Sequence, residues 1–170
     1  MSPSCQTPEE KGPSPDWVER RRNFPAYKAH GYKLRWIDTT GSIVHLVARE
    51  VARLQQRDTS MWYLQGNVHA MRLNSRGETL ENLQSQEAQV FLDRGIFIAQ
   101  KDVRLSGVKG LRLETDHLVW DQQRQLMIAT GWVRIYTAQE TLRGEGLEYH
   151  THLHTYRLRR TRGVVTVPSL

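Results

Sequence analysis

The chain has a single cysteine and no long apolar run. Cys5 alone cannot form an internal disulfide, and one thiol cannot build a cysteine-based zinc site. No apolar stretch approaches the roughly 18 residues that a membrane helix needs, and no signal-peptide hydrophobic region is present. The sequence as it stands therefore predicts a soluble chain without disulfides.

The sequence also lacks the short motifs that mark common catalytic sites. It contains no phosphate-binding glycine loop, no nucleophile elbow and no HExxH zinc motif. We therefore expect a protein that is not an enzyme and that needs no cofactor.

One histidine pattern looks like a metal site. His150, His152 and His154 alternate, so a strand would place all three imidazoles on one face. Tyr149 and Leu153 have the opposite parity, and we expect them to face inward. The histidines would then face solvent, so no metal site is predicted.

Length, composition and charge limit the fold class and the kinds of partner that the chain can have. A chain of 170 residues suits one domain with a sizeable core. Its hydrophobic content of 38% and mean hydropathy of −0.62 are low for a compact core, but they fit an elongated sheet in which nearly every second residue faces water. The net charge of +6 makes nucleic acid, a membrane surface or a phosphorylated ligand plausible partners.

The amino-terminal part has the composition of a tether. Residues 1–16 are rich in proline, serine, glycine and charge, and such a segment cannot bury enough apolar surface to offset its ordering entropy. We predict a flexible tether over residues 1–24 and a folded domain over residues 25–168.

The clearest strand pattern begins at residue 111. Leu113 and Thr115 share one face of a strand, but Leu118 and Trp120 have the opposite parity. An extra residue near Asp116 explains this change, because a β-bulge adds a residue and bends the strand.

The return strand that follows carries a second change of phase. Leu126 and Ile128 are its first apolar residues, Val133 and Ile135 come later, and the parity changes around Ala129. The unit is therefore predicted to be a bent hairpin of about 25 residues with a kink in each arm.

The same kink recurs along the chain. In each unit a small residue follows a leucine by two positions and precedes an apolar residue by three. A fixed period in this range is typical of stacked supersecondary units that share one continuous core. The outward arms give the pairs Ala48/Val51, Ser85/Ala88, Thr115/Leu118 and Gly144/Leu147, and the return arms give Gly66-x-Val68, Lys101-x-Val103, Gly131-x-Val133 and Gly163-x-Val165.

Two segments, residues 43–56 and 79–92, fit either a strand or a helix. In the first, Val47 and Val51 also fit a helical face, and the alanine, arginine and glutamine content favours helix. We predict strands because Ala48-x-x-Val51 is in register with the later units.

Four motifs carry a resemblance to a known family: Trp62-x-Leu64-x-Gly66-x-Val68, Leu113-x-Thr115-x-x-Leu118-x-Trp120-Asp121, Gly131-x-Val133-x-Ile135 and Leu142-x-Gly144-x-Gly146-Leu147-x-Tyr149. Through them the chain resembles the periplasmic lipopolysaccharide-transport proteins of the LptC type, which share a bent β-jellyroll with LptA and the amino-terminal part of LptD. The turn from Asp38 to Gly41 favours LptC over an LptA-like relative. LptC proteins usually carry an amino-terminal membrane helix or anchor, which this sequence does not contain.

The resemblance implies an all-β fold, a bent antiparallel β-jellyroll of stacked hairpin repeats. It implies a periplasmic protein, attached to the inner membrane in its full-length form. Its function would be to receive lipopolysaccharide from an inner-membrane ABC transporter and to pass it to an LptA-like jellyroll docked on the carboxy-terminal edge strand.

The inward apolar residues have two interpretations, as core or as a groove for acyl chains. Each buried methylene contributes about 0.8 kcal/mol, so a groove needs no polar motif to hold a lipid. This inward set is Trp62, Leu64, Val68, Leu83, Val90, Val103, Leu113, Leu118, Trp120, Ile128, Val133, Ile135, Leu147 and Tyr149. The basic residues expected to meet phosphates at the groove's rim are Lys101, Lys109, Arg112 and Arg143.

A basic sheet that binds nucleic acid through exposed aromatic residues is the rival interpretation. Trp62, Trp120 and Tyr149 share the inward register with aliphatic residues. This placement favours an apolar interior, so lipid is expected as the ligand and nucleic acid is not.

Overall fold

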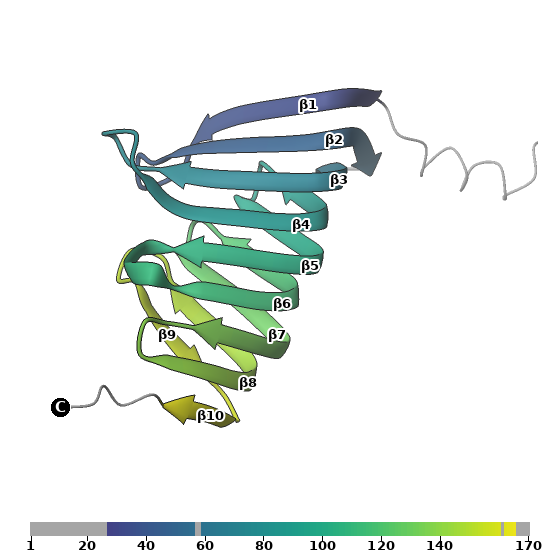
Figure 1. The fold of residues 1–170 in the computed structure, drawn as a ribbon. Coiled ribbons are helices and arrows are strands. Elements are labelled where there is room, and N and C mark those ends of the chain that lie inside the picture. Colours follow the sequence, from purple (N-terminus) through teal and green to yellow (C-terminus); the bar gives the residue numbers. More distant parts are fainter. Residues whose placement is uncertain (1–26, 57–58, 161, 166–170) are drawn as a thin grey trace, which may run out of the picture.

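The structure, a computed structural model, describes residues 27–56, 59–160 and 162–165. These residues form one antiparallel sheet in which β1 to β8 follow one another in sequence order and β8 then pairs with both β9 and β10 (Figure 1). The predicted tether, residues 1–24, lies outside the described residues. The elements are β1 (Tyr27–Ile37), β2 (Ile43–Gln56), β3 (Thr59–Leu73), β4 (Thr79–Phe91), β5 (Ile96–Gly107), the 3-10 turn η1 (Val108–Gly110), β6 (Arg112–Asp121), β7 (Leu126–Tyr136), β8 (Glu140–His150), β9 (Thr155–Leu158) and β10 (Arg162–Val165).

The fold class predicted from the sequence is confirmed: the domain is all-β, antiparallel and jellyroll-like. The two ambiguous segments are strands, since β2 and β4 pair with both of their neighbours. In each of them buried side chains alternate with more exposed ones, as a half-buried strand requires.

Each long strand from β2 to β8 bends at an irregularity near its middle. In the outward strands the inward-facing residues on either side of the bend are three positions apart, as with Ala48 and Val51 in β2. In the return strands they are four positions apart, as with Leu64 and Val68 in β3. The extra residue of the return strand makes a bulge, and a bulge bends its strand.

The backbone at two of these bends adopts left-handed conformations. Gly66 and Asn67 in β3 have φ of 74° and 50°, and Lys101 and Asp102 in β5 have φ of 62° and 52°. The bends lie side by side along the sheet, so they fold it into two facing halves (Figure 1). The kink predicted in each arm is therefore present, and it forms a continuous corner.

The prediction that the parity of β7 changes at its kink is wrong. The kink is where the sequence indicates, between Ala129 and Trp132, but the four-residue spacing leaves Ala129 and Val133 on the same parity. Met127 is therefore buried in place of Ile128, which is only half-buried on the other face.

The carboxy-terminal return arm is interrupted. The sequence predicts a single return strand from Tyr156 to Val167, but β9 and β10 are two short strands that pair with opposite ends of β8. The chain crosses the corner between them, where Glu145 N–H donates to Arg159 O and Arg159 N–H donates to Gly146 O, each at 2.9 Å. The last residues of the predicted strand, from 166 on, lie outside the described residues.

The three histidines do not share a strand face, which corrects the sequence interpretation. β8 ends at His150, and residues 151–154 form the turn to β9. Leu153, predicted to face inward, is 56% exposed in this turn. A turn breaks the alternation on which the prediction rested.

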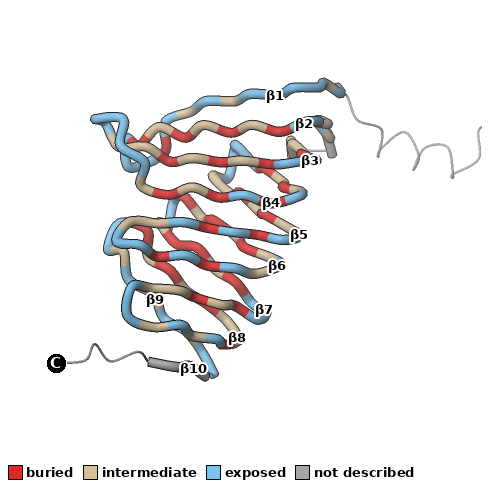
Figure 2. Tube along the Cα trace, viewed as in Figure 1, coloured by how far each residue is buried: buried red, intermediate tan, exposed pale blue. Residues whose placement is uncertain are grey.

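The core is one apolar layer between the two halves of the sheet. Figure 2 shows buried positions recurring along β2 to β8 and none on β1. The buried residues form a single cluster that runs from Val44 in β2 to Tyr149 in β8. Stacked hairpins therefore share one continuous interior, as the repeat pattern predicts.

Candidate functional site

The candidate site is the apolar interior together with the polar residues that close it. Of the fourteen residues in the predicted inward set, twelve are buried in the core cluster. Trp62 packs against this cluster while remaining half-buried, and its ring stacks on Tyr32 with the centroids 5.5 Å apart. Ile128 is the exception described above.

The interior is filled by its own side chains. Leu64, Leu118 and Ile135 have no exposed surface, and Phe97 packs edge-on against Trp120 with ring centroids 6.4 Å apart. Phe97 is not in the predicted inward set, although its alternation with Ala99 indicates an inward position. In this conformation the inward residues make the core, so a ligand that used them would have to separate the two halves.

The edges of the two halves meet opposite the corner. Hairpin turns alternate between the two ends of the strands, so the β1–β2 turn belongs to one half and the β6–β7 turn to the other. Trp36 Nε1 donates to Gln122 Oε1 at 3.0 Å, and Thr39 Oγ1 donates to the Gln122 carbonyl at 2.9 Å. These side chains therefore join the first hairpin turn to a turn of the opposite half.

A second link between the halves is built on Arg72. Its guanidinium donates to both carboxylate oxygens of Glu81, at 2.7 and 2.9 Å, and lies 3.7 Å from Asp38 Oδ2. It also donates to the Thr151 carbonyl in the β8–β9 turn, at 3.4 Å. We call Trp36, Asp38, Thr39, Arg72, Glu81, Gln122 and Thr151 the clasp.

The charges of the clasp are buried and paired. The Arg72 side chain is 6% exposed, and those of Asp38 and Glu81 are 3% exposed. A forked arginine–carboxylate pair is among the stronger polar contacts because both hydrogen bonds are charge-assisted. Removing the guanidinium would leave two buried carboxylates unpaired, at a cost of about 3–5 kcal/mol.

Tyr149 connects the clasp to the core. Its hydroxyl lies 3.5 Å from Glu81 Oε1 and 3.3 Å from His154 Nδ1. Burial, followed by the nearby Glu81 charge, raises the pKa of Tyr149 far above its ordinary value of 10.0. The hydroxyl therefore stays protonated and acts as a hydrogen-bonding group at the end of an otherwise apolar side chain.

Sequence reasoning missed the clasp, although a signal for it was present. Arg72 continues the buried parity of Val68 and Ala70, and Glu81 has that of Leu83. Two opposite charges at core positions on neighbouring strands indicate a buried ion pair, because an unpaired charge would not be tolerated there.

The four predicted phosphate-binding residues do not gather into one site. Lys101 lies at the corner of β5, whereas Lys109 lies in η1, beyond the end of that strand. The Arg112 guanidinium lies over the Tyr136 ring, 5.6 Å from its centroid. Arg143 is exposed on the outer face of β8, opposite Arg134 of β7.

Lys101 has a carboxylate partner. Its Nζ lies 2.6 Å from Glu87 Oε1 across the corner. This hydrogen bond raises the pKa of Lys101 and lowers the pKa of Glu87 from their ordinary values. The positive charge of Lys101 is therefore already balanced by a carboxylate of the neighbouring strand.

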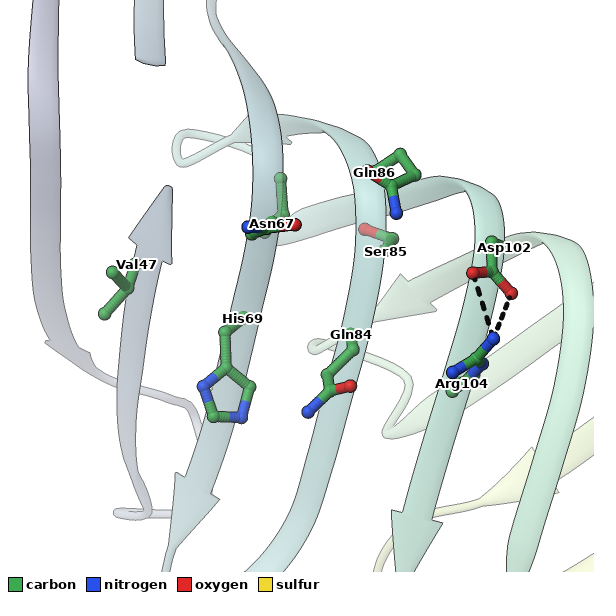
Figure 3. A pocket seen from close by; sticks show the side chains of 9 residues that line it. Val47, Asn67, His69, Gln84, Ser85, Gln86, Asp102 and Arg104 are labelled. Atoms are coloured by element: carbon green, nitrogen blue, oxygen red, sulfur yellow. Dashed lines mark hydrogen bonds and ion pairs between the residues drawn. The ribbon is translucent and has the colours of Figure 1, made fainter. Parts of the chain in front are cut away.

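The outer face carries polar hollows at the corner. One, of about 510 Å³, is lined by residues of β2 to β5 that include His69, Gln84 and Ser85, and an Arg104–Asp102 ion pair borders it (Figure 3). Polar side chains dominate its wall, so it differs from the apolar interior in the chemistry it offers.

No group of histidine, cysteine or acidic side chains suited to a metal ion occurs in the described part of the chain. Within the same residues, no helical segment has the length and apolar character needed to traverse a bilayer. No protein-family model matches the chain, and no curated protein matches it at a significant level.

Proposed function

We propose that this protein is a non-enzymatic lipid-transfer module that holds the acyl chains of lipopolysaccharide between the two halves of its bent sheet. The observation that supports this is the continuous apolar inner layer, which is enclosed on one side by the corner and on the other by the polar clasp. A layer that runs through seven consecutive strands matches the shape of several long alkyl chains better than that of a compact ligand.

Lipid binding would exchange one set of apolar contacts for another. Acyl chains would replace contacts that inward residues such as Leu118 and Leu147 now make with one another, and each buried methylene contributes about 0.8 kcal/mol. The halves must separate at the clasp for this exchange, because the corner is continuous backbone. Hydrogen bonds such as those of Gln122 can be replaced by water when they open, so separation at this edge costs less than rupture of an apolar seam.

The proposed place of this activity is the periplasm, next to the inner membrane. The module would receive lipid from an inner-membrane ABC transporter and relay it toward the outer membrane. Its carboxy-terminal edge strand, β10, would pair with an LptA-like jellyroll, since β10 ends the sheet and only its β8 side is paired within the described residues.

The positions of the aromatic residues favour this proposal over nucleic-acid binding. Trp120 and Tyr149 are 4% and 1% exposed, and Trp62 is stacked on Tyr32. Rings in these positions do not offer the row of exposed faces on which successive bases stack.

The test places a photoreactive leucine analogue at single positions and measures crosslinking to lipopolysaccharide. Analogues at buried Leu118 and Leu147 should label the lipid. The same analogue at Leu92 and Leu153, which are 44% and 56% exposed, should not. Because the analogue is close in size to leucine, the packed core should accept it.

Equal labelling from the buried and the exposed positions would rule out an interior lipid site. So would the absence of labelling from Leu118 and Leu147 when the folded protein is incubated with lipopolysaccharide. A Gln122→Ala variant sharpens the test, since loosening the clasp should increase labelling from the buried positions only.

A further inference from the structure

A second hollow lies on the outer face, close to the carboxy-terminal end of the sheet. It has a volume of about 490 Å³ and is lined by residues of β5 to β8, among them Trp132, Arg134, Arg143 and Asp116. It shares Asp102 and Arg104 with the hollow of Figure 3, so the two adjoin along the corner. It lies outside the apolar core.

Trp132 is the exposed aromatic residue of this hollow. Its side chain is 66% exposed, the highest value for a tryptophan in the described residues. Trp120, by comparison, is 4% exposed in the core. A large flat ring left in water beside a hollow suggests a ligand, since burial of such a ring favours binding.

The charges around Trp132 are only partly paired. Arg104 pairs with Asp102 at 3.1 Å, and Arg134 lies 3.5 Å from Glu114. The side chains of Arg143 and Asp116 have no ion-pair or hydrogen-bond partner among the described residues. Within the described part of the chain, the hollow therefore offers an unpaired guanidinium, an unpaired carboxylate and an aromatic face.

The register of the sheet gives an electrostatic reason why this hollow would bind an anion. Arg134 of β7 lies directly opposite Arg143 of β8. Like charges placed opposite one another on neighbouring strands repel. An anionic group bound at Arg143 would relieve this repulsion, and a guanidinium suits carboxylate or phosphate oxygens.

We propose that this hollow binds an acidic saccharide. The apolar face of a sugar ring would stack on Trp132, its carboxylate or phosphate would pair with Arg143, and its hydroxyl groups would donate to Asp116. A nucleic acid fits less well, because a run of phosphates needs several cations, whereas Arg104 and Arg134 in this hollow already lie beside carboxylates. This inference goes beyond the proposed function and does not depend on a lipid in the interior.

Calorimetric titration of the full chain with trigalacturonate and with glucose 6-phosphate tests the proposal, and neutral maltotriose is the matched ligand control. At least one acidic sugar should bind more tightly than maltotriose. Trp132→Ala and Arg143→Ala should each weaken that binding about tenfold, the effect of one lost stacking or charge-assisted contact. Both side chains are exposed, so both variants should keep the parent's melting temperature.

Two control variants lie at the other end of the sheet. Ile37→Ala removes an exposed apolar side chain, and Arg35→Ala removes an exposed guanidinium, both from β1. Neither should change the affinity for the acidic sugar. The trigalacturonate and glucose 6-phosphate titrations also show whether Arg143 prefers a carboxylate or a phosphate.

Several results would overturn the proposal. These are absence of binding by either acidic sugar at a ligand concentration of about 1 mM, equal affinity for maltotriose, and binding that Trp132→Ala leaves unchanged. Tighter binding of oligo-dT through Trp132 and Arg143 would assign the hollow to single-stranded nucleic acid instead. Failure of the interior crosslinking test would remove the lipid proposal and leave this one standing.

Discussion

Arg72 and Glu81 occupy positions where the strand pattern calls for apolar side chains. Both point between the two halves, where each neutralises the other and Arg72 also reaches Asp38. Alternation alone predicted the apolar core well, because burial of one sheet face depends on parity. It could not predict the links between the two halves, since Thr151 is brought to Arg72 only by the bend of the whole sheet.

Lys101 and Glu87 provide a test of electrostatics at a single pair. The Lys101 hydrogen bond lowers the pKa of Glu87 from its ordinary 4.5. A carboxyl whose pKa is lower in the folded state stabilises the fold above its unfolded pKa and loses this contribution as the pH falls through the folded pKa. Lys101→Gln should therefore raise the pKa of Glu87 and reduce the loss of stability below about pH 4.5.

The pKa of Glu87 can be followed by NMR titration of its side-chain carbon, and the stability by urea unfolding at several pH values. Lys109→Gln is the matched control, because Lys109 is exposed in η1 and forms neither an ion pair nor a hydrogen bond with Glu87. An unchanged Glu87 titration in Lys101→Gln would show that the pair is not formed in solution.

The strands differ in how well their sequences predict them. β6 has its residues buried as predicted, because the change from Leu113 to Leu118 parity is visible in the sequence. β7 was predicted one residue out of phase in its first half, because Leu126, Met127 and Ile128 are consecutive apolar residues. Such a run fits either parity, and only the four-residue spacing at the bend selects Met127.

Gly144 shows why the corner of β8 differs from the earlier ones. The matching positions hold alanine, serine and threonine, but a Cβ on Gly144 would lie 2.5 Å from Leu158 Cγ and 2.6 Å from the Arg159 carbonyl. The chain crosses from β9 to β10 at this point, so the backbone leaves no room for a side chain.

Gly144→Ala should therefore destabilise the domain by about 1–3 kcal/mol, the usual cost of overpacking. For a chain of this size each kcal/mol lowers the melting temperature by about 2–4 °C. Thermal unfolding followed by circular dichroism measures the effect. Gly131→Ala is the control, since its Cβ would meet no atom within 4 Å and its melting temperature should stay close to that of the parent. Equal melting temperatures for both variants would contradict the close crossing.

The sheet has two ends with different characters. β1 exposes Lys28, Lys33 and Arg35 along its outer face, and such charges discourage uncontrolled pairing at a sheet edge. β10 is short, and its four residues pair with residues 140–143 of β8. The proposed partner of β10 is an LptA-like jellyroll, which would add its first strand there.

A Val165→Pro variant tests this docking. Proline lacks the N–H that strand addition requires, so co-purification with an LptA-type jellyroll should be lost while crosslinking of lipid from Leu118 persists. Val165→Thr keeps the N–H and the branched shape, and it should co-purify as the parent does. Undiminished recovery of the partner with Val165→Pro would place the docking surface elsewhere.

Because of the two links of the clasp, closure of the sheet depends on the number of hairpins between the linked residues. Pairing between neighbouring strands sets no limit on a sheet, so a duplicated hairpin could in principle be spliced in anywhere. A duplication between Trp36 and Gln122, or between Arg72 and Thr151, would move one partner of a link along the stack by two strand spacings, about 9.5 Å. Each link therefore fixes the number of strands that can lie between its two partners. Within the described residues no link of the clasp spans an addition before Trp36 or after Thr151, so whole repeats could be added there, whereas an insertion between these residues would have to rebuild the closure of the sheet.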